Sequence, residues 1–258
     1  MSHLKKTTKY LVVLIFFYSS LWGMKIESDY HAVDVAGKQR MYTQRMLKDY
    51  AMIGMNNSFG NSTKDLETII GEFEEHLLSL HNYTKNKAIK KSTEKVKKLW
   101  LPIKKILKNN PKKEEVSKLQ ENLEVLLSAS NDTTVLFAKE TGKPAGEIVN
   151  ISGRQRMLSQ RMASLYMLKV WGIDDKKFKD KMENAMKLFK DSLKELEESK
   201  LNTEEINLLL NEVKKSFMFF EVMNKSSNVF IPALIYKKSN DILKNMNTAT
   251  HCYVEVCK

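Results

Sequence analysis

A ten-residue stretch with the side chains to bind an anion occurs twice in this chain. The first copy runs from Gly37 to Met46 (GKQRMYTQRM) and the second from Gly153 to Met162 (GRQRMLSQRM), and seven of the ten positions are identical. All five arginines of the protein lie in these two copies, whereas the other 38 basic residues are lysines. A guanidinium group is planar and can bind a carboxylate or another oxyanion through two parallel hydrogen bonds. The distribution therefore indicates a site that needs the guanidinium group and not only its positive charge.

Helical periodicity predicts which motif residues point inward. At 100° per residue, the glycine, the arginine before the first methionine, and the next glutamine share one face with apolar residues. These residues are Gly37, Arg40, Gln44, Gly153, Arg156 and Gln160. We therefore expect Arg40 and Arg156 to lie inside the fold or in a helix–helix interface. The residues expected to point away from this face are Gln39, Gln155, Arg45 and Arg161.

An arginine on a packing face is costly unless a partner compensates its charge. No acid of the motif lies one turn from Arg40 or Arg156, so three partners are open: an acid on another helix, carbonyl groups at a helix C-terminus, or a bound anion. The glycine one turn earlier allows close approach of another backbone, and the glutamine one turn later offers donors and acceptors. Two such helices meeting at their glycines would form a small, positively charged slot that suits a compact oxyanion. The other interpretation is structural, with both arginines holding the helices together.

The N-terminus is typical of a targeting segment. Lys5, Lys6 and Lys9 precede an apolar run from Tyr10 to Tyr18, which is too short for a transmembrane helix. We predict a signal peptide over residues 1–23 and a periplasmic mature protein, with an uncleaved membrane anchor as the alternative.

The remaining composition argues against several classes of function. The net charge is +12, but the lysines are interleaved with acids, as in Lys194–Glu198, which favours a solvated helix surface over a nucleic-acid partner. The sequence has no Ser/His/Asp arrangement, HExxH, CxxC or phosphate-binding glycine loop. We therefore expect no enzyme activity, no cofactor and no metal site.

The two cysteines, Cys252 and Cys257, are candidates for a disulfide because an oxidising compartment is expected. Five residues apart on one straight helix is too far for a bridge, so the bond requires the helix to end near Val254. Free thiols, or a metal or redox site that includes His251, are the alternatives.

The duplication extends beyond the motif and predicts the architecture. An offset of 116 residues also aligns Phe73 with Phe189, and the chain has only nine glycines and four prolines, which favours an all-α protein. Each copy contains four amphipathic stretches, so we predict two tandem up-down four-helix bundles, over residues 24–143 and 144–258, in an elongated rod. The predicted helices span about 28–55, 62–82, 92–108, 114–140, 147–171, 176–199, 203–228 and 232–254. The short link at Gly142–Gly146 would let the fourth helix continue almost directly into the fifth.

The motifs Ala36–Met46 (AGKQRMYTQRM) and Ser152–Met162 (SGRQRMLSQRM) resemble the PilJ/NarX-type sensor domain. This is the N-terminal domain of type IV pilus methyl-accepting chemotaxis transducers and of nitrate/nitrite sensor kinases. The resemblance implies an extracytoplasmic, ligand-sensing four-helix bundle in which the arginine before the methionine binds an anion between two first helices. Carried over, that arginine is Arg40 in one copy and Arg156 in the other.

The resemblance also indicates which partners to expect. Such sensors continue into a transmembrane helix and an output module, which this sequence does not contain. We therefore expect a periplasmic anion-binding protein that acts on a separate membrane-bound transducer or kinase and forms a homodimer through its first helices. An interaction protein without a small ligand is the alternative, and a thiol redox protein that uses Cys252 and Cys257 is a third hypothesis.

Overall fold

The computed structural model describes residues 24–57, 59–173, 175, 177–225 and 231–257. The predicted signal segment, residues 1–23, lies outside this part of the chain. The described residues form eight α-helices and one 3₁₀ turn and contain no strand, which confirms the prediction of an all-α protein. None of the described helices combines the length and the apolar character that crossing a membrane requires.

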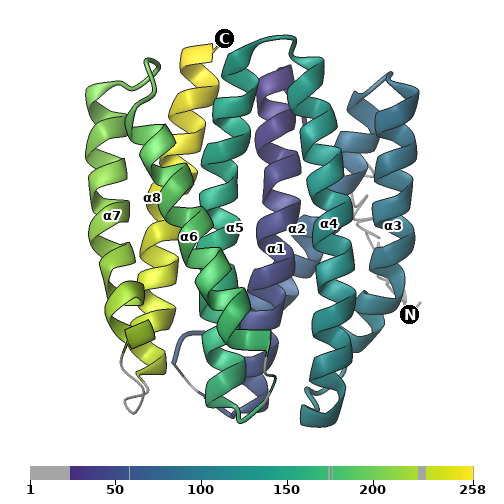
Figure 1. The fold of residues 1–258 in the computed structure, drawn as a ribbon. Coiled ribbons are helices and arrows are strands. Elements are labelled where there is room, and N and C mark those ends of the chain that lie inside the picture. The colour runs from purple at the N-terminus through teal and green to yellow at the C-terminus, as the bar shows by residue number, and fades with distance from the viewer. Residues whose placement is uncertain (1–23, 58, 174, 176, 226–230, 258) are drawn as a thin grey trace, which may run out of the picture.

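The helices fall into two sets of four along the chain (Figure 1). The first set is α1 (Asp29–Gly54), α2 (Ser62–Tyr83), α3 (Lys87–Leu107) and α4 (Val116–Glu140), with the 3₁₀ turn Lys113–Glu115 before α4. The second set is α5 (Pro144–Val170), α6 (Lys177–Glu197), α7 (Glu204–Lys225) and α8 (Pro232–Cys257).

Local capping explains several boundaries. The side chain of Ser28 accepts a hydrogen bond from the backbone N–H of His31 and starts α1 one residue from the predicted position. Helix α3 starts five residues earlier than predicted because Asn86 caps it, with 2.9 Å between its Oδ1 and the backbone nitrogen of Ala88. Pro102 lies inside α3 and does not end it.

The two sets of helices pack side by side, so the predicted elongated rod was wrong. Helix α1 packs against α2 and α4, α5 packs against α6 and α8, and the most extensive interface in the molecule joins α1 to α5 (Figure 1). Gly142, at φ +65°, reverses the chain after α4, and Pro144 starts α5 in the opposite direction. Helix α5 therefore returns beside α1 instead of extending α4.

Equivalent aromatic pairs support the internal repeat. The ring centroids of Phe73 and Trp100 are 4.5 Å apart in the first set, and those of Phe189 and Phe217 are 4.5 Å apart in the second. Both pairs lie in the hydrophobic core. The 116-residue offset relates Phe73 to Phe189, and an offset one residue longer relates Trp100 to Phe217.

Helices α1 and α5 occupy the middle of the molecule (Figure 1). Most side chains of both helices are buried, including polar ones, because each helix has neighbours on several sides. Buried polar groups need partners within the protein. The polar motif residues are therefore placed where their contacts determine how the two sets of helices associate.

The course of the C-terminal helix argues against a disulfide between Cys252 and Cys257. Helix α8 does not end near Val254 but continues through Cys257, and Cys252 is a free thiol. An uninterrupted helix holds the two positions too far apart for a bridge.

Candidate anion-binding site between helices α1 and α5

Helices α1 and α5 approach each other closely at the two motif glycines. A Cβ atom placed on Gly37 would lie 3.8 Å from the Cα atom of Gly153, and one placed on Gly153 would lie 2.9 Å from Nη2 of Arg156 and 3.4 Å from Nη2 of Arg40. The missing side chains therefore leave the space that both guanidinium groups occupy. Arg40 and Arg156 are completely buried, at 0% exposure, which confirms that they point inward.

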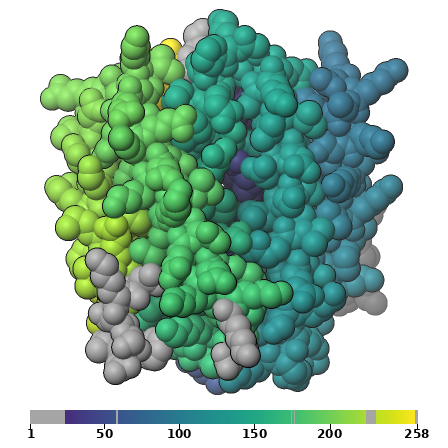
Figure 2. All heavy atoms as spheres, in the orientation of Figure 1, coloured from purple at the N-terminus to yellow at the C-terminus, as the bar shows by residue number. Residues whose placement is uncertain are grey.

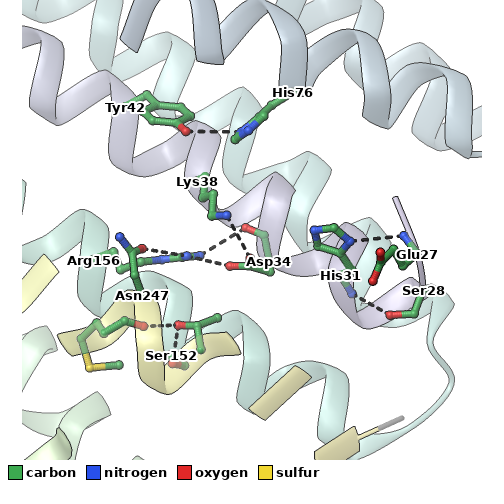
Figure 3. A network of polar contacts seen from close by, with 12 residues as sticks. Glu27, Ser28, His31, Asp34, Lys38, Tyr42, His76, Ser152, Arg156 and Asn247 are labelled. Atoms are coloured by element: carbon green, nitrogen blue, oxygen red, sulfur yellow. Dashed lines mark hydrogen bonds and ion pairs between the residues drawn. The ribbon is translucent and has the colours of Figure 1, made fainter. Parts of the chain in front are cut away.

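Arg156 has an acidic partner on the opposite helix. Its Nη1 lies 2.6 Å from Oδ1 of Asp34 and donates to Oδ1 of Asn247 at 3.2 Å, while its Nη2 donates to the carbonyl oxygen of Asp34 at 3.2 Å (Figure 3). Lys38 contacts the same carboxylate at 3.3 Å. Burial opposes ionisation of Asp34, but the charges of Arg156 and Lys38 outweigh it and hold the pKa of Asp34 below its usual value. Arg156 therefore joins α5 to α1 and α8 through a compensated charge.

Arg40 occupies the equivalent position without an acid. Its Nη1 donates to Oδ1 of Asn131 at 3.0 Å, and its Nη2 donates to the carbonyl oxygen of Asn150 at 3.0 Å. Asn150 is the counterpart of Asp34 at the 116-residue offset, and its Nδ2 donates to the carboxylate of Glu147 at 3.1 and 3.2 Å. Within the described part of the chain, no carboxylate lies at ion-pair distance from Arg40. One substitution between the copies, Asp34 against Asn150, therefore leaves one of two equivalent arginines without an ion-pair partner, although the more distant charge of Glu147 partly offsets its charge.

The electrostatics of Arg40 follow from this environment. Burial, together with the nearby charges of Arg154 and Arg156, lowers the pKa of Arg40 to about 9. The side chain therefore remains protonated at neutral pH. Its Nε has no acceptor among the described residues, and the Nε of Arg156 has none either. Arg40 is thus a buried cation with a free donor, which is an unfavourable arrangement until an anion compensates it.

Asn131 and Asn247 are equivalent residues, which lie 116 positions apart in the sequence. In the structure Asn131 and Asn247 each accept a hydrogen bond from Nη1 of the motif arginine of their own copy. The 116-residue offset therefore holds in the last helix of each set as well.

The two glutamines that the sequence placed in the slot bind across the same interface. Oε1 of Gln160 accepts from Nζ of Lys48 at 2.6 Å, and Oε1 of Gln44 accepts from the hydroxyl of Ser164 at 3.3 Å. Nζ of Lys48 also donates to Oδ1 of Asn240 at 2.9 Å. Gln44 and Gln160 thus form a second polar layer, one turn beyond the guanidinium groups. Lys48 was not among the residues predicted to line the slot, although its counterpart Ser164 marks another polar difference between the copies.

The prediction that Gln39 and Gln155 point away from the core was wrong. Nε2 of Gln39 donates to the carbonyl oxygen of Phe73 at 3.1 Å, and Gln155 makes the same bond to Phe189 at 3.0 Å. Both glutamines are buried because the central helices have neighbours on the sides where an ordinary amphipathic helix meets solvent.

Arg45 and Arg161 point away from the α1–α5 interface, as predicted. Arg45 pairs with Asp65 of α2 at 2.9 Å, and Arg161 pairs with Glu124 of α4 at 3.0 Å. Both side chains are about one-fifth exposed. They connect the central helices to their neighbours and leave the buried site to Arg40 and Arg156.

A cleft of about 530 Å³ leads from the surface to Arg40. Residues of α4, α5 and α6 line it, and Arg40 of α1 lies at its inner side. Figure 2 shows atoms of α1, in purple, exposed in a hollow between the teal and green helices. The basic lining residues besides Arg40 are Arg154, Arg161 and Lys181. Arg40, although it is 0% exposed, therefore borders a positively charged cleft.

Comparison with known protein families identifies the domains that contain the two motifs. Residues 24–132 and 140–217 each match the family described as type IV pili methyl-accepting chemotaxis transducer N-term. The chain belongs to this family. It carries two copies of the transducer N-terminal domain, as the repeated motif predicted. No curated protein and no solved structure matches the chain.

In this transducer-domain protein, one chain supplies both first helices. The resemblance implied an anion site between two first helices, and here α1 and α5 form such a pair within one chain. The surface of α1 that would form a dimer with another copy is therefore covered by α5.

Proposed function

We propose that this protein is an extracytoplasmic sensor-type module that binds one small oxyanion, such as nitrate or nitrite, through Arg40. Its family supports a role in chemotaxis transducer signalling. The observation that carries the proposal is the asymmetry of the two arginines. Arg156 is neutralised by Asp34, whereas Arg40 is equally buried and has only neutral acceptors.

The contacts of Arg40 suit an oxyanion. Asn131 and Asn150 accept from Nη1 and Nη2 through neutral oxygens, and Nε has no acceptor. An anion that takes the place of the Asn131 oxygen would replace a hydrogen bond from the charged guanidinium to a neutral acceptor by an ion pair, in which both donor and acceptor are charged. The anion would also neutralise the positive charge of Arg40, which is buried in a low-dielectric environment.

Binding at this position would couple the two sets of helices. Arg40 belongs to α1, Asn131 to α4 and Asn150 to α5, so a ligand held by Arg40 contacts the elements that define how α1 lies against α5. A ligand changes a conformational equilibrium only as far as it binds one state better than another. We propose that a separate membrane-bound transducer or kinase recognises the ligand-dependent arrangement of α1 and α5.

A thermal-shift screen with nitrate, nitrite, sulfate and acetate tests this function. An anion at a hundredfold excess over its dissociation constant should stabilise the wild type by about 2.7 kcal/mol through mass action. Arg40→Lys should weaken the effect because the planar fork is lost, and Arg40→Met should abolish it.

Two outcomes would contradict the proposed function. One is that no anion stabilises the wild type, and the other is that Arg40→Met responds to anions as the wild type does. Either result would leave the alternative in which both arginines only hold helices together, as the Arg156–Asp34 pair does between α5 and α1.

A further inference from the structure

The cleft beside Arg40 is much larger than a small inorganic anion requires. Its volume is about 530 Å³, whereas a water molecule takes about 30 Å³ in the liquid, so an anion of four or five heavy atoms needs on the order of 100 Å³. Sites for organic small molecules have volumes of roughly 300–1,000 Å³. The cleft therefore has the size of a site for an organic molecule.

The walls of the cleft are apolar on three helices. Leu127 of α4, Leu158 of α5 and Leu188 of α6 line it, and Leu188 is 42% exposed. An inorganic oxyanion gains nothing from such walls, because it has no apolar surface to bury. An apolar group of the ligand would remove both itself and the exposed part of Leu188 from water.

The charges around the cleft select an anion. Glu124 is the one acid among its lining residues, and it already pairs with Arg161 at 3.0 Å. Arg154 and Lys181 lie 3.8 Å from their acidic partners, a separation typical of weak ion pairs. The lining, which includes Arg40, is therefore strongly cationic. A neutral or cationic ligand is disfavoured there.

We infer that the oxyanion group held by Arg40 is the carboxylate of an organic anion whose apolar body lies in the cleft between α4, α5 and α6. This inference rests on the proposed function, because it takes Arg40 as the group that binds the anion. The carboxylate replaces the Asn131 oxygen on Nη1 of Arg40. The apolar body then extends outward along the leucine walls, and Arg154 and Lys181 lie beside the path of entry.

Calorimetric titration of the full chain with acetate, butyrate, hexanoate and nitrate tests the inference. Each methylene buried in the cleft should increase affinity about fourfold, so hexanoate should bind on the order of a hundredfold more tightly than acetate. Leu188→Gln, an uncharged change at an exposed cleft position, should weaken hexanoate about tenfold because the apolar wall is lost, and should leave nitrate little changed. Leu208→Gln is the matched control, because Leu208 is 62% exposed on α7 and does not line the cleft. Arg40→Met should abolish the binding of every anion.

The outcomes separate this inference from the proposed function. If nitrate binds through Arg40 but affinity is flat from acetate to hexanoate, the organic ligand is wrong and the anion-binding function stands. If hexanoate is favoured but Leu188→Gln has no effect, or Arg40→Met still binds hexanoate, the cleft is not the site and the inference fails. If no anion binds at all, both proposals fail.

Discussion

The two motif arginines should respond in opposite ways to the same substitution. Arg156→Met leaves the carboxylate of Asp34 buried, with a side-chain exposure of 9%, and with Lys38 as its remaining cationic contact at 3.3 Å. Breaking a buried ion pair by removing one partner costs about 3–5 kcal/mol. Arg40→Met breaks no ion pair, so it leaves no carboxylate unpaired. It replaces a buried cation that has no ion-pair partner by an apolar chain of similar length. We expect that variant to be as stable as the wild type or more stable.

Urea denaturation at pH 7 in a buffer of low anion concentration measures the difference. Arg156→Met should lower the free energy of unfolding by about 3–5 kcal/mol, which corresponds to a decrease in Tm of roughly 6–20 °C for a chain of this size. The pKa of Asp34 is lowered in the folded state, so its stabilising contribution is present above the unfolded pKa of about 4 and is lost as pH falls through the folded value. The cost of Arg156→Met should therefore shrink in acid.

The double variant Asp34→Asn/Arg156→Met is the control for this interpretation. It removes both charges, so no buried carboxylate is left without a partner, and most of the lost stability should return. The reasoning would be refuted if Arg40→Met and Arg156→Met cost the same, or if the double variant were no more stable than Arg156→Met alone.

Three further predictions follow from the central helices. Burial raises the pKa of Asp49 to about 7. The contribution of Asp49 to stability is therefore complete below about pH 4 and is lost as pH rises through 7. In urea denaturation, Asp49→Asn should exceed the wild type in stability at pH 8 but not at pH 4. Gly153→Val should lower Tm and weaken anion binding, because its Cβ would lie 2.9 Å from Nη2 of Arg156. The control Gly71→Ala should raise stability slightly, because a Cβ at Gly71 would meet nothing within 4 Å. Calorimetry should give about one bound anion per chain, because one motif arginine, Arg156, already has an acid.

The sequence predicted the helices and the inward arginines for a physical reason. Apolar residues repeat with the helical period, and the glycine, arginine and glutamine of each motif fall within that pattern. Burial of Arg40 and Arg156 follows from their position on the helix alone. Gln39 and Gln155 were misplaced because periodicity assumes one solvent-facing side, and a central helix surrounded by neighbours has none.

The packing of the two sets of helices could not be deduced in the same way. The surface of α1 that holds Gly37 can meet another copy of the chain or α5, and the same residues favour both. The turn at Gly142 selects the second arrangement by directing α5 back along the molecule. The pairing of Arg156 with Asp34 was hidden for the same reason, because it depends on the register between α1 and α5 and not on spacing within either helix.

The central claim is that Arg40, and not Arg156, binds the anion, and nuclear magnetic resonance of the arginine side chains tests it most directly. The protein has only five arginines, so a ¹⁵N-arginine sample gives at most five Nε–H signals, which single Arg→Lys variants assign. On titration with the anion that stabilises the fold, the Arg40 signal should shift in a saturable way, and the Arg156 signal should move far less because Asp34 keeps its partner. A saturable shift centred on Arg156, with Arg40 unchanged, would contradict the account.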